Sequence, residues 1–175
     1  MKRVVVIGNS GGGKSTLARR LAARLACPCM EIDCLLWQPG WRLAPVETYN
    51  AEHARLMAGE RWIIDGLGRQ DSIPQRIARS TDIVLVDMPL WMHFWLAAER
   101  QFQWAAGNLE YPPAGIVQMP PTEALFRTIW EVDRTWMPDI RRLIAEEERR
   151  GKRVYRLASP SDVENFGLPD LGNSN

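Results

Sequence analysis

The sequence predicts an α/β fold in which a parallel sheet carries helices on both faces. Two observations lead to this prediction: short apolar runs recur along the chain, and helical patterns or turn-rich segments separate them. Such alternation is typical of strand–helix–strand units that build a parallel sheet. The chain has 175 residues, of which 46% are hydrophobic and 25% are charged, and this is the size of one compact domain. We therefore expect a single domain over residues 1–168 and a flexible tail over residues 169–175.

Five short segments are predicted to be the strands of this sheet. Most of them are uninterrupted runs of valine, isoleucine and other apolar residues. Runs without polar alternation are typical of strands that are buried on both faces, as they are in a parallel sheet. The predicted strands are residues 3–8, 29–33, 61–65, 82–87 and 152–157.

Helical patterns fill most of the chain between these strands. In the first pattern, Leu17, Leu21 and Leu25 recur at intervals of four and form an apolar stripe. Two long patterns follow the fourth strand, and Pro138 predicts a bend in the second of them. The predicted helices are residues 14–26, 46–59, 90–106 and 122–149, with room for a short helix within 66–81.

Three smaller features are predicted from turn and capping residues. Residues 34–45 are rich in proline, glycine and tryptophan, which predicts an irregular surface loop with aromatic anchors. Residues 107–121 contain two proline pairs and two glycines, a composition typical of a mobile flap. Ser161 and Glu164 predict a capping box for a last helical turn.

The most informative stretch is residues 8–16, GNSGGGKST, which match the pattern G-x-x-x-x-G-K-[ST]. In such a phosphate-binding loop, backbone N–H groups surround phosphate oxygens, the lysine reaches the β and γ phosphates, and the hydroxyl binds Mg²⁺. Three consecutive glycines, at positions 11, 12 and 13, allow the positive φ values that turn those amides inward. The stretch lies between a predicted strand and a predicted helix, which is the context that the motif requires. ATP is therefore the expected phosphoryl donor, with Mg²⁺ as its metal.

The residues expected to bind ATP are Gly8, Asn9, Ser10, Gly11, Gly12, Gly13, Lys14, Ser15 and Thr16. Among them, Lys14 is expected to be catalytic and Ser15 to hold the metal. Thr16 also fits the first turn of the helix, and this alternative stays open.

Three aspartates, Asp33, Asp65 and Asp87, end predicted strands. The carboxyl ends of parallel strands gather at one edge of the sheet, where ligands bind. Phosphoryl transfer needs carboxylates there to hold magnesium and to orient the attacking group. We expect a functional role for Asp65, because Arg69 follows on the same loop, and we expect Asp33 to face the acceptor. A turn-forming role for Asp65 stays open, and for Asp87 helix capping competes with a metal-side role.

Tryptophans give the aromatic signal of this sequence. Trp37 and Trp41 lie in a predicted loop and are expected to contact the substrate. Trp91 and Trp95 stand one turn apart in a helical pattern, with Trp104 further along, and this spacing favours a place in the core. Stacking on nucleic-acid bases is the alternative for these three residues.

Composition restricts the class of protein. Lys and Arg total 22 against 21 Asp and Glu, so the net charge of +1 argues against a chain built to coat nucleic acid or an anionic membrane. No stretch approaches the roughly 18 apolar residues of a spanning helix, and no signal segment is visible, so we expect a soluble, cytoplasmic protein. Cys27, Cys29 and Cys34 have no nearby histidine and are expected to be buried side chains rather than zinc ligands.

Taken together, four stretches resemble the adenylate kinase-related P-loop kinases: GNSGGGKST, EID after the first helix, IIDGLGR on the third strand and VDMP on the fourth. Within that group, DCLLWQPGW and WIIDG look closest to the FlaR-like proteins, often named DNA topology modulation proteins. The resemblance covers nearly the whole chain. It implies a P-loop fold of three layers, a five-stranded parallel sheet in the order 2-3-1-4-5, and a helical lid over about residues 100–134.

The resemblance also implies roles for individual residues. Adenylate kinases carry D-G-F-P-R where this chain has DGLGR, which implies that Asp65 is a magnesium-side carboxylate and that Arg69 contacts the acceptor. Lid arginines of that group stabilise the transferring phosphoryl group. The candidates here are Arg100, Arg127 and Arg134, of which Arg100 and Arg134 are expected to be catalytic. Arg141 and Arg142 compete for this role, and a place on a solvated helix face stays open for each of these arginines.

Two functions compete at this stage. The first is an ATP-dependent phosphotransferase whose acceptor is a nucleotide or another small molecule. The acceptor is expected to contact Asp33, Trp37, Trp41 and Arg69, and the acceptor-binding region is expected over about residues 34–60. Adenylate kinases place an arginine shortly after the second strand, and DCLLW lacks one, so the acceptor stays open. The second is an ATP-dependent regulatory protein that binds DNA. It would need a basic face, and arginines around the lid and near the end of the last long helix could supply one.

Overall fold

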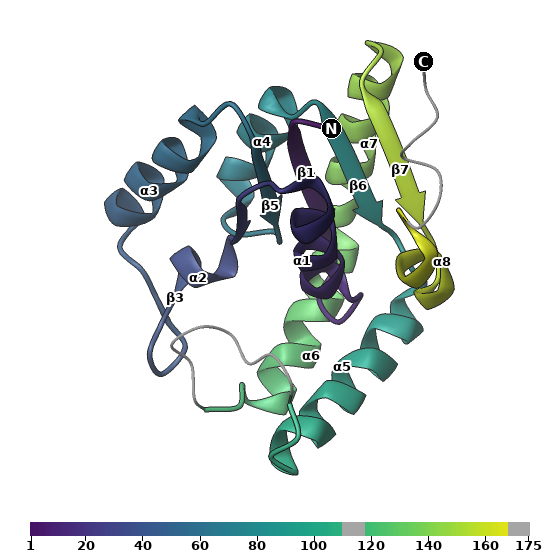
Figure 1. The fold of residues 1–175 in the computed structure, drawn as a ribbon. Coiled ribbons are helices and arrows are strands. Elements are labelled where there is room, and N and C mark those ends of the chain that lie inside the picture. The colour runs from purple at the N-terminus through teal and green to yellow at the C-terminus, as the bar shows by residue number, and fades with distance from the viewer. Residues whose placement is uncertain (110–117, 168–175) are drawn as a thin grey trace.

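The computed structural model describes residues 1–109 and 118–167 and has the predicted α/β fold (Figure 1). Five parallel strands form one sheet in the order β2-β5-β1-β6-β7. Numbered within this sheet alone, the order is 2-3-1-4-5, so the expected topology is confirmed. The middle of the expected lid, residues 110–117, and the expected tail lie outside the described residues.

The elements agree with the predicted segments in type and approximate extent. The strands of the sheet are β1 (Arg3–Gly8), β2 (Cys29–Glu31), β5 (Trp62–Asp65), β6 (Asp82–Val86) and β7 (Arg153–Leu157). The longer helices are α1 (Lys14–Leu25), α3 (Val46–Ala58), α5 (Leu90–Ala105), α6 (Thr122–Glu131) and α7 (Met137–Arg149). Shorter elements are α2 (Asp33–Leu36), β3 (Trp37–Gln38), β4 (Arg42–Leu43), a 3₁₀ turn (Gln70–Ser72), α4 (Ile73–Arg79), a π-helix (Val132–Trp136) and α8 (Pro160–Asn165).

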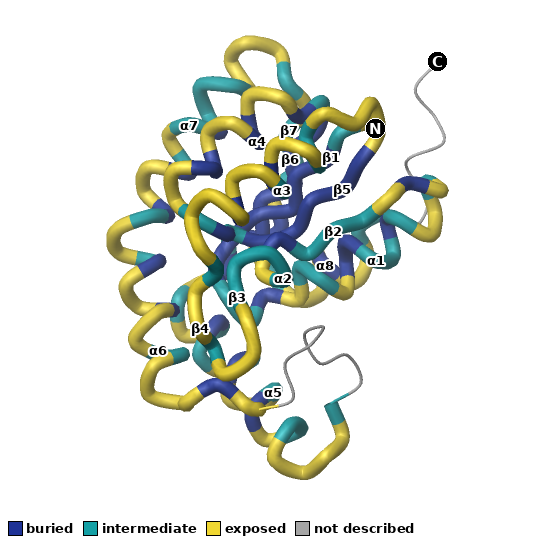
Figure 2. The backbone as a smooth tube through the Cα atoms, turned by 90° about the vertical axis from the view of Figure 1, so that its left-hand side faces the viewer, coloured by how far each residue is buried: buried dark blue, intermediate teal, exposed yellow. Residues whose placement is uncertain are grey.

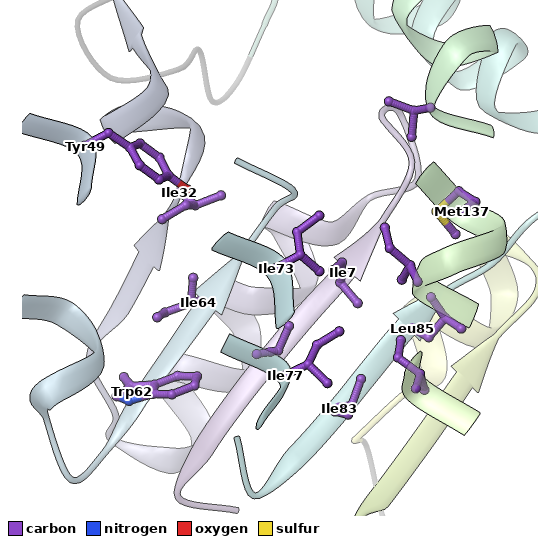
Figure 3. Packing of buried hydrophobic residues seen from close by; sticks show 14 residues of the cluster. Ile7, Ile32, Tyr49, Trp62, Ile64, Ile73, Ile77, Ile83, Leu85 and Met137 are labelled. Carbon is purple, nitrogen blue, oxygen red and sulfur yellow. The ribbon is translucent and has the colours of Figure 1, made fainter. Parts of the chain in front are cut away.

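The sheet has helices on both faces because the side chains of its strands alternate between two apolar layers. Val4 and Val6 of β1 pack with α1 and α8 on one face. Val5 and Ile7 pack on the opposite face with α3, α4 and α7 (Figure 3). All four side chains are fully buried, which is why β1 has no polar alternation. Figure 2 shows the buried strands enclosed by helices with exposed outer faces.

The elements that could form a site lie beyond the carboxyl ends of the strands. The strands run in one direction, and α2, β3, α5 and α6 lie past their carboxyl ends (Figure 1). The chain reverses next to this edge after β1, β2 and β5, and those connections contain the phosphate loop, α2 and the segment from Gly66 to Ser72. A parallel sheet offers its ligand-binding edge at this place.

Two predictions about the segment after the first helix were wrong in detail. The second strand ends at Glu31, and Asp33 is the first residue of α2 rather than the last residue of a strand. The backbone NH of Ile32 still bonds the carbonyl of Asp65, so the chain leaves the sheet beside β5. Residues 34–45, predicted as irregular, include the end of α2 and a small antiparallel hairpin of β3 and β4. The tight turn at Gly40, with φ of 77°, makes this hairpin possible.

The helical stretch from 122 to 149 is interrupted by the π-helix, which ends two residues before Pro138. Pro138 lies in the first turn of α7, where its missing N–H is not needed. The predicted capping box at Ser161 and Glu164 was also wrong, because Ser159 and Asp162 form it two residues earlier. Pro160 occupies the first helical position there, which sequence reasoning overlooked.

The tryptophans of α5 were predicted to be buried, and none of them is: Trp104 is partly exposed. Trp91 is 63% exposed and Trp95 is 69% exposed, so helical spacing alone gave the wrong environment. Two of the three cysteines, Cys29 and Cys34, are only partly buried. In the described part of the chain, no helix is both long enough and apolar enough to cross a bilayer.

Replacement of Gly8 by alanine is expected to destabilise the fold by about 2–4 kcal/mol. Gly8 has φ of 152°, and a Cβ at this position would lie 2.1 Å from the carbonyl oxygen of Val86 on the neighbouring strand. The matched control is Gly59→Ala, because Gly59 has a negative φ and its nearest neighbour would lie at 3.5 Å. We expect the control to change the free energy of unfolding by less than about 1 kcal/mol in urea denaturation. Equal effects of the two changes would contradict this account of Gly8.

Candidate functional site

The phosphate loop owes its shape to glycines that act in two different ways. Gly11 and Gly13 have φ values of 83° and 76°, as predicted. Gly12 does not adopt a positive φ, so the expectation for this residue was wrong. Instead, a Cβ on Gly12 would lie 2.9 Å from a methyl carbon of Val86 and 3.2 Å from the ring of His93. Space, rather than backbone conformation, therefore requires glycine at position 12.

Two side chains hold the loop against the helices beyond the sheet. The Asn9 side-chain amide donates to the carbonyl of Ile129 in α6 at 2.8 Å, and its carbonyl oxygen accepts the backbone NH of Ser10 at 2.8 Å. Nδ1 of His93, in α5, lies 2.8 Å from the carbonyl oxygen of Ser10. Because a carbonyl only accepts, Nδ1 carries the proton of this bond. The Asn9 side chain is 1% exposed and so faces away from any phosphate.

Lys14 lies at the centre of a group of charges with little hydration. Its Nζ donates to the backbone carbonyl of Asn9 at 2.7 Å. Burial lowers the pKa of Lys14, and the nearby carboxylates of Asp65 and Asp33 oppose this shift. A group whose pKa is shifted by burial and by specific charged partners is a candidate for a functional site. Ser15 follows in the first turn of α1, while Thr16 is exposed there.

The two predicted carboxylates differ in their surroundings. Asp65, at the end of β5, is 2% exposed, and burial raises its pKa to about 6, although Lys14 and a hydrogen bond from Ser15 oppose this. One oxygen of Asp65, Oδ1, is buried without a hydrogen-bond partner. Solvent reaches Asp33 from the cavity described below. Protein atoms surround the other sides of its carboxylate and remove part of its hydration, which raises the pKa of Asp33. Lys14 and Arg100 oppose the shift at Asp33.

A cavity of about 1100 Å³ opens beside the phosphate loop. The loop contributes Ser10 and Lys14, and every other part of the wall comes from chain segments beyond the sheet. The remaining lining residues are Asp33, Cys34, Leu36, Trp37, Gly40, Trp41, Leu43, Leu67, Gly68, Arg69, Gln70, Asp71, Arg100, Pro120, Pro121, Ala124, Leu125, Thr128, Glu131, Val132 and Trp136. The volume is sufficient for a small-molecule ligand.

One wall of this cavity is aromatic. The rings of Trp37 and Trp41, at the two sides of the small hairpin, lie with centroids 5.7 Å apart and planes inclined at 69°. Trp104 of α5 approaches the Trp41 ring at 6.4 Å. Trp41 also donates its indole NH to the carbonyl of Gln118 at 2.9 Å. The structure thus brings both predicted substrate-contacting tryptophans to the cavity.

The predicted arginines fall into two groups. Arg69 and Arg100 line the cavity, and among the described residues the guanidinium of Arg100 makes no hydrogen bond and no ion pair within 4 Å. Arg134 is exposed and lies over the ring of Trp130 at 4.7 Å, outside the cavity lining. Arg127 is exposed as well and pairs with Glu123 on its own helix. Of these arginines, the structure places only Arg69 and Arg100 near Lys14 and Asp33.

Asp87 has a partner that the sequence did not indicate. Arg141 of α7 donates to both of its oxygens, at 2.7 to 3.1 Å, and lies within 3.8 Å of Asp133 as well. The N-cap of α5 is Pro89, so Asp87 does not cap that helix. This ion pair joins the end of β6 to α7 beside the site.

Sequence reasoning also missed a fully buried arginine. Arg76 of α4 donates to the hydroxyl of Ser72 at 2.9 Å and to the carbonyls of Gly66 and Leu67. The Tyr49 hydroxyl lies 3.4 Å from the same guanidinium and accepts the backbone NH of Arg69 at 3.1 Å. The sequence IPQRIAR shows only an arginine in a short helix, so nothing local distinguishes it from a solvated residue. Arg76 fixes the loop that carries Arg69.

The residues present fit a magnesium-bound nucleotide. The orphaned oxygen of Asp65 lies buried beside Ser15, which is the pair predicted to hold the metal. Because Gly11 and Gly12 have no Cβ, the loop can lie directly against His93 of α5 and Val86 of β6. In the part of the chain that the structure describes, no three His, Cys, Asp or Glu side chains converge as a metal-binding group. Metal binding here would therefore depend on phosphate oxygens together with protein oxygens.

Comparison with known proteins gives likenesses in fold. The chain matches no family model and no curated protein, so membership of the FlaR-like family stays a prediction. Among solved structures, a gluconokinase from Sinorhizobium meliloti 1021 is 17% identical, with a TM-score of 0.44 over 85% of this chain and 97% of that one. A shikimate kinase from Aquifex aeolicus vf5 is 17% identical, with a TM-score of 0.40 over 79% of this chain and 98% of that one.

Replacement of His53 by phenylalanine is expected to change how stability depends on pH. Burial and the nearby charge of Arg76 lower the pKa of His53 to about 4, from an ordinary value of 6.5. The unfolded chain therefore binds a proton as pH falls below 6.5, while the folded protein does not, so the wild type loses stability in this range. Between pH 7 and pH 5 the loss should be about 2 kcal/mol greater for the wild type than for His53→Phe.

The measurement is urea denaturation of both proteins at several pH values without nucleotide. His93 is common to both proteins, so its titration cancels in the difference. Parallel stability curves from pH 7 to pH 5 would show that His53 is not held neutral by its surroundings.

Proposed function

We propose that this protein is an ATP-dependent phosphotransferase that acts on a nucleotide or another small molecule in the cavity. The observation that carries the proposal is a shared space: Lys14 of the phosphate loop and Asp33, Arg69 and Arg100 line the same cavity. A phosphoryl donor on the loop and an acceptor beside Asp33 would then lie next to each other. Positioning two reactants in this way supplies much of the catalysis in phosphoryl transfer.

On the donor side, the phosphate loop binds the ATP phosphates. Backbone amides of residues 8 to 15 face the phosphates, and Lys14 exchanges the carbonyl of Asn9 for the β and γ phosphates. Asn9 acts through its backbone and its link to α6, because its side chain is turned away. Ser15 and Asp65 hold Mg²⁺, which when bound neutralises charge on the phosphate oxygens.

On the acceptor side, Asp33 orients the attacking group and receives its proton. Its raised pKa is suited to this role, because a base is most effective when its pKa lies near the working pH. Arg69, held by Tyr49 and the Arg76 network, contacts the acceptor. Trp37 and Trp41 form the wall against which the acceptor lies.

Arg100 stabilises the charge that spreads over the transferring phosphoryl group. Its guanidinium is largely enclosed, and this loss of hydration lowers its pKa, while Asp33 opposes the shift. A preorganised cation in a poorly hydrated site interacts strongly with developing negative charge. Arg134 lies over the ring of Trp130, outside the cavity lining, and has no role in the proposed mechanism.

No observation favours the DNA-binding alternative. Several of the arginines that could form a basic face are already paired with carboxylates: Arg141 with Asp87, Arg142 with Asp139, and Arg150 with Glu147. Such pairs leave little excess positive charge for contacts with a DNA backbone. The small-molecule activity is therefore the one that we propose.

Replacement of Lys14 by alanine should lower ATP-dependent phosphorylation by about 10²-fold or more, because the change removes a cation from the transferring phosphates. The control is Lys2→Ala, since Lys2 is exposed at the start of the chain. The assay measures ADP release with Mg²⁺ against a panel of nucleoside monophosphates, nucleosides and small hydroxyl compounds, with products identified by mass. Turnover that survives in Lys14→Ala would contradict the assignment of the donor site.

Replacement of Asp33 by asparagine should lower kcat by about 10² to 10⁴-fold, because an amide cannot accept the proton of the attacking group. The KM for ATP should change little, since the donor phosphates lie on the loop. Asp139→Asn is the matched control, because Asp139 is exposed on α7 and pairs only with Arg142. An unchanged kcat in Asp33→Asn, with the chain still folded, would remove Asp33 from the mechanism.

A further inference from the structure

The acceptor side of the cavity carries information about the chemical class of the acceptor. Trp37 and Trp41 form a corner, with ring centroids 5.7 Å apart and planes inclined at 69°. Leu36 and Leu43 extend this apolar surface within the same cavity. A corner of two indoles offers a face and an edge to a flat ring, which is the geometry that aromatic pairs prefer. An acyclic polar chain would leave these surfaces uncovered.

The aromatic corner is built in advance of any ligand. Trp41 has φ of 56°, in the left-handed region that a bulky residue rarely adopts. Its indole NH bonds the carbonyl of Gln118, and Trp104 contacts its ring. Residues held in such a conformation cluster at ligand sites, where surrounding contacts fix them. These two contacts, together with the Trp37 ring, hold the Trp41 ring in place at the cavity wall.

The charges of the cavity give a second, independent constraint. Among the described residues, six side chains that are charged at neutral pH in their ordinary state line it: Lys14, Asp33, Arg69, Asp71, Arg100 and Glu131. The donor phosphates would use Lys14 and Arg100, and Arg69 already lies 3.4 Å from the carboxylate of Asp71. Among the described residues, Asp33 and Glu131 have no ion pair.

The acceptor side consequently has more negative than positive charge once the donor is bound. Proteins bind phosphate groups with clusters of arginine or with helix N-termini. The first turn of α6 borders the cavity but already carries the carboxylate of Glu123, and among the described lining residues the donor phosphates leave the acceptor one arginine, Arg69. A phosphate dianion next to Asp33 and Glu131 would meet two like charges and one arginine that is already paired. A neutral acceptor avoids this repulsion, and its oxygens can accept from the guanidinium of Arg69, which lines the cavity and whose Nε faces Asp71.

We propose that the acceptor is an alcohol that carries a flat heteroaromatic ring and no phosphate group, such as a nucleoside or a hydroxymethyl-substituted heteroaromatic compound. This inference rests on the proposed function. The ring lies in the Trp37–Trp41 corner and the hydroxyl lies at Asp33. The hydroxyl oxygen forms a bond to the γ-phosphorus of ATP, the bond from that phosphorus to the β–γ bridging oxygen breaks, and ADP leaves. The hydroxyl proton passes to the Asp33 carboxylate.

The first test compares three sets of compounds as acceptors with ATP and Mg²⁺. The sets are aromatic alcohols (adenosine, thymidine and pyridoxine), the monophosphates of the two nucleosides, and non-aromatic alcohols (glycerol and inositol). We expect at least one aromatic alcohol to be phosphorylated with kcat/KM tenfold or more above every compound of the other sets. The compound with the highest kcat/KM shows whether the acceptor is a nucleoside or another heteroaromatic alcohol.

Two other outcomes are distinguishable. A monophosphate or a non-aromatic alcohol as the best acceptor would overturn the inference and leave the proposed phosphotransferase in place. Phosphorylation of no compound, in a protein that still binds ATP, would contradict the proposed function, and the inference would fall with it.

The second test removes one ring from the corner. Trp37→Ala should raise the KM for the aromatic alcohol about tenfold or more, because stacking on an indole is lost, while the KM for ATP stays within threefold. Trp37→Phe should restore most of the loss, which a merely unfolded variant would not do. Trp95→Ala is the matched control, since Trp95 is 69% exposed on α5 and does not line the cavity. Equal changes in both KM values, or no change in either, would overturn the role of the corner.

Discussion

The close contact between the end of β1, the end of β6 and α5 is the constraint on which the rest of the site depends. The backbone at Gly8 touches Val86, and the backbone at Gly11 touches His93, so the phosphate loop has no room for side chains at these positions. The loop therefore has one path, and Lys14 begins α1 at a fixed place. Because α1 packs on the sheet through Leu17 and Leu21, the position of the lysine is tied to the core.

Buried polar contacts also support the acceptor side of the site. The buried Arg76 holds the carbonyls of Gly66 and Leu67, directly after Asp65. Tyr49, which shares this network, comes from α3 and stacks on His53. A buried guanidinium is costly unless its donors are satisfied, and here most of them bond to backbone carbonyls or hydroxyls. The polar contacts under the acceptor loop thus join α3 to the loop after β5 and to α4.

Much of the donor half could be predicted from sequence, because a contiguous stretch from Gly8 to Thr16 determines it and its motif has a physical meaning at each position. The strands and their order were also predictable, from apolar runs and from a resemblance. The partners of Asp87 and Arg76 were not, since a long-range ion pair leaves no local pattern. The exposure of Trp91 and Trp95 escaped prediction for a related reason: helical spacing shows that residues share a face but not which face the core covers.

The π-helix between α6 and α7 determines how one long helical segment serves two surfaces. Before it, Leu125 and Thr128 face the cavity, and after it, Met137 and Ile140 face the sheet. Consecutive residues of an α-helix are about 100° apart, and the wider π turn shifts this phase. Deletion of a single residue within this turn would rotate one surface relative to the other. Insertions and deletions should therefore be tolerated in this segment far less than substitutions are, and the length of the turn is itself a functional property of the chain.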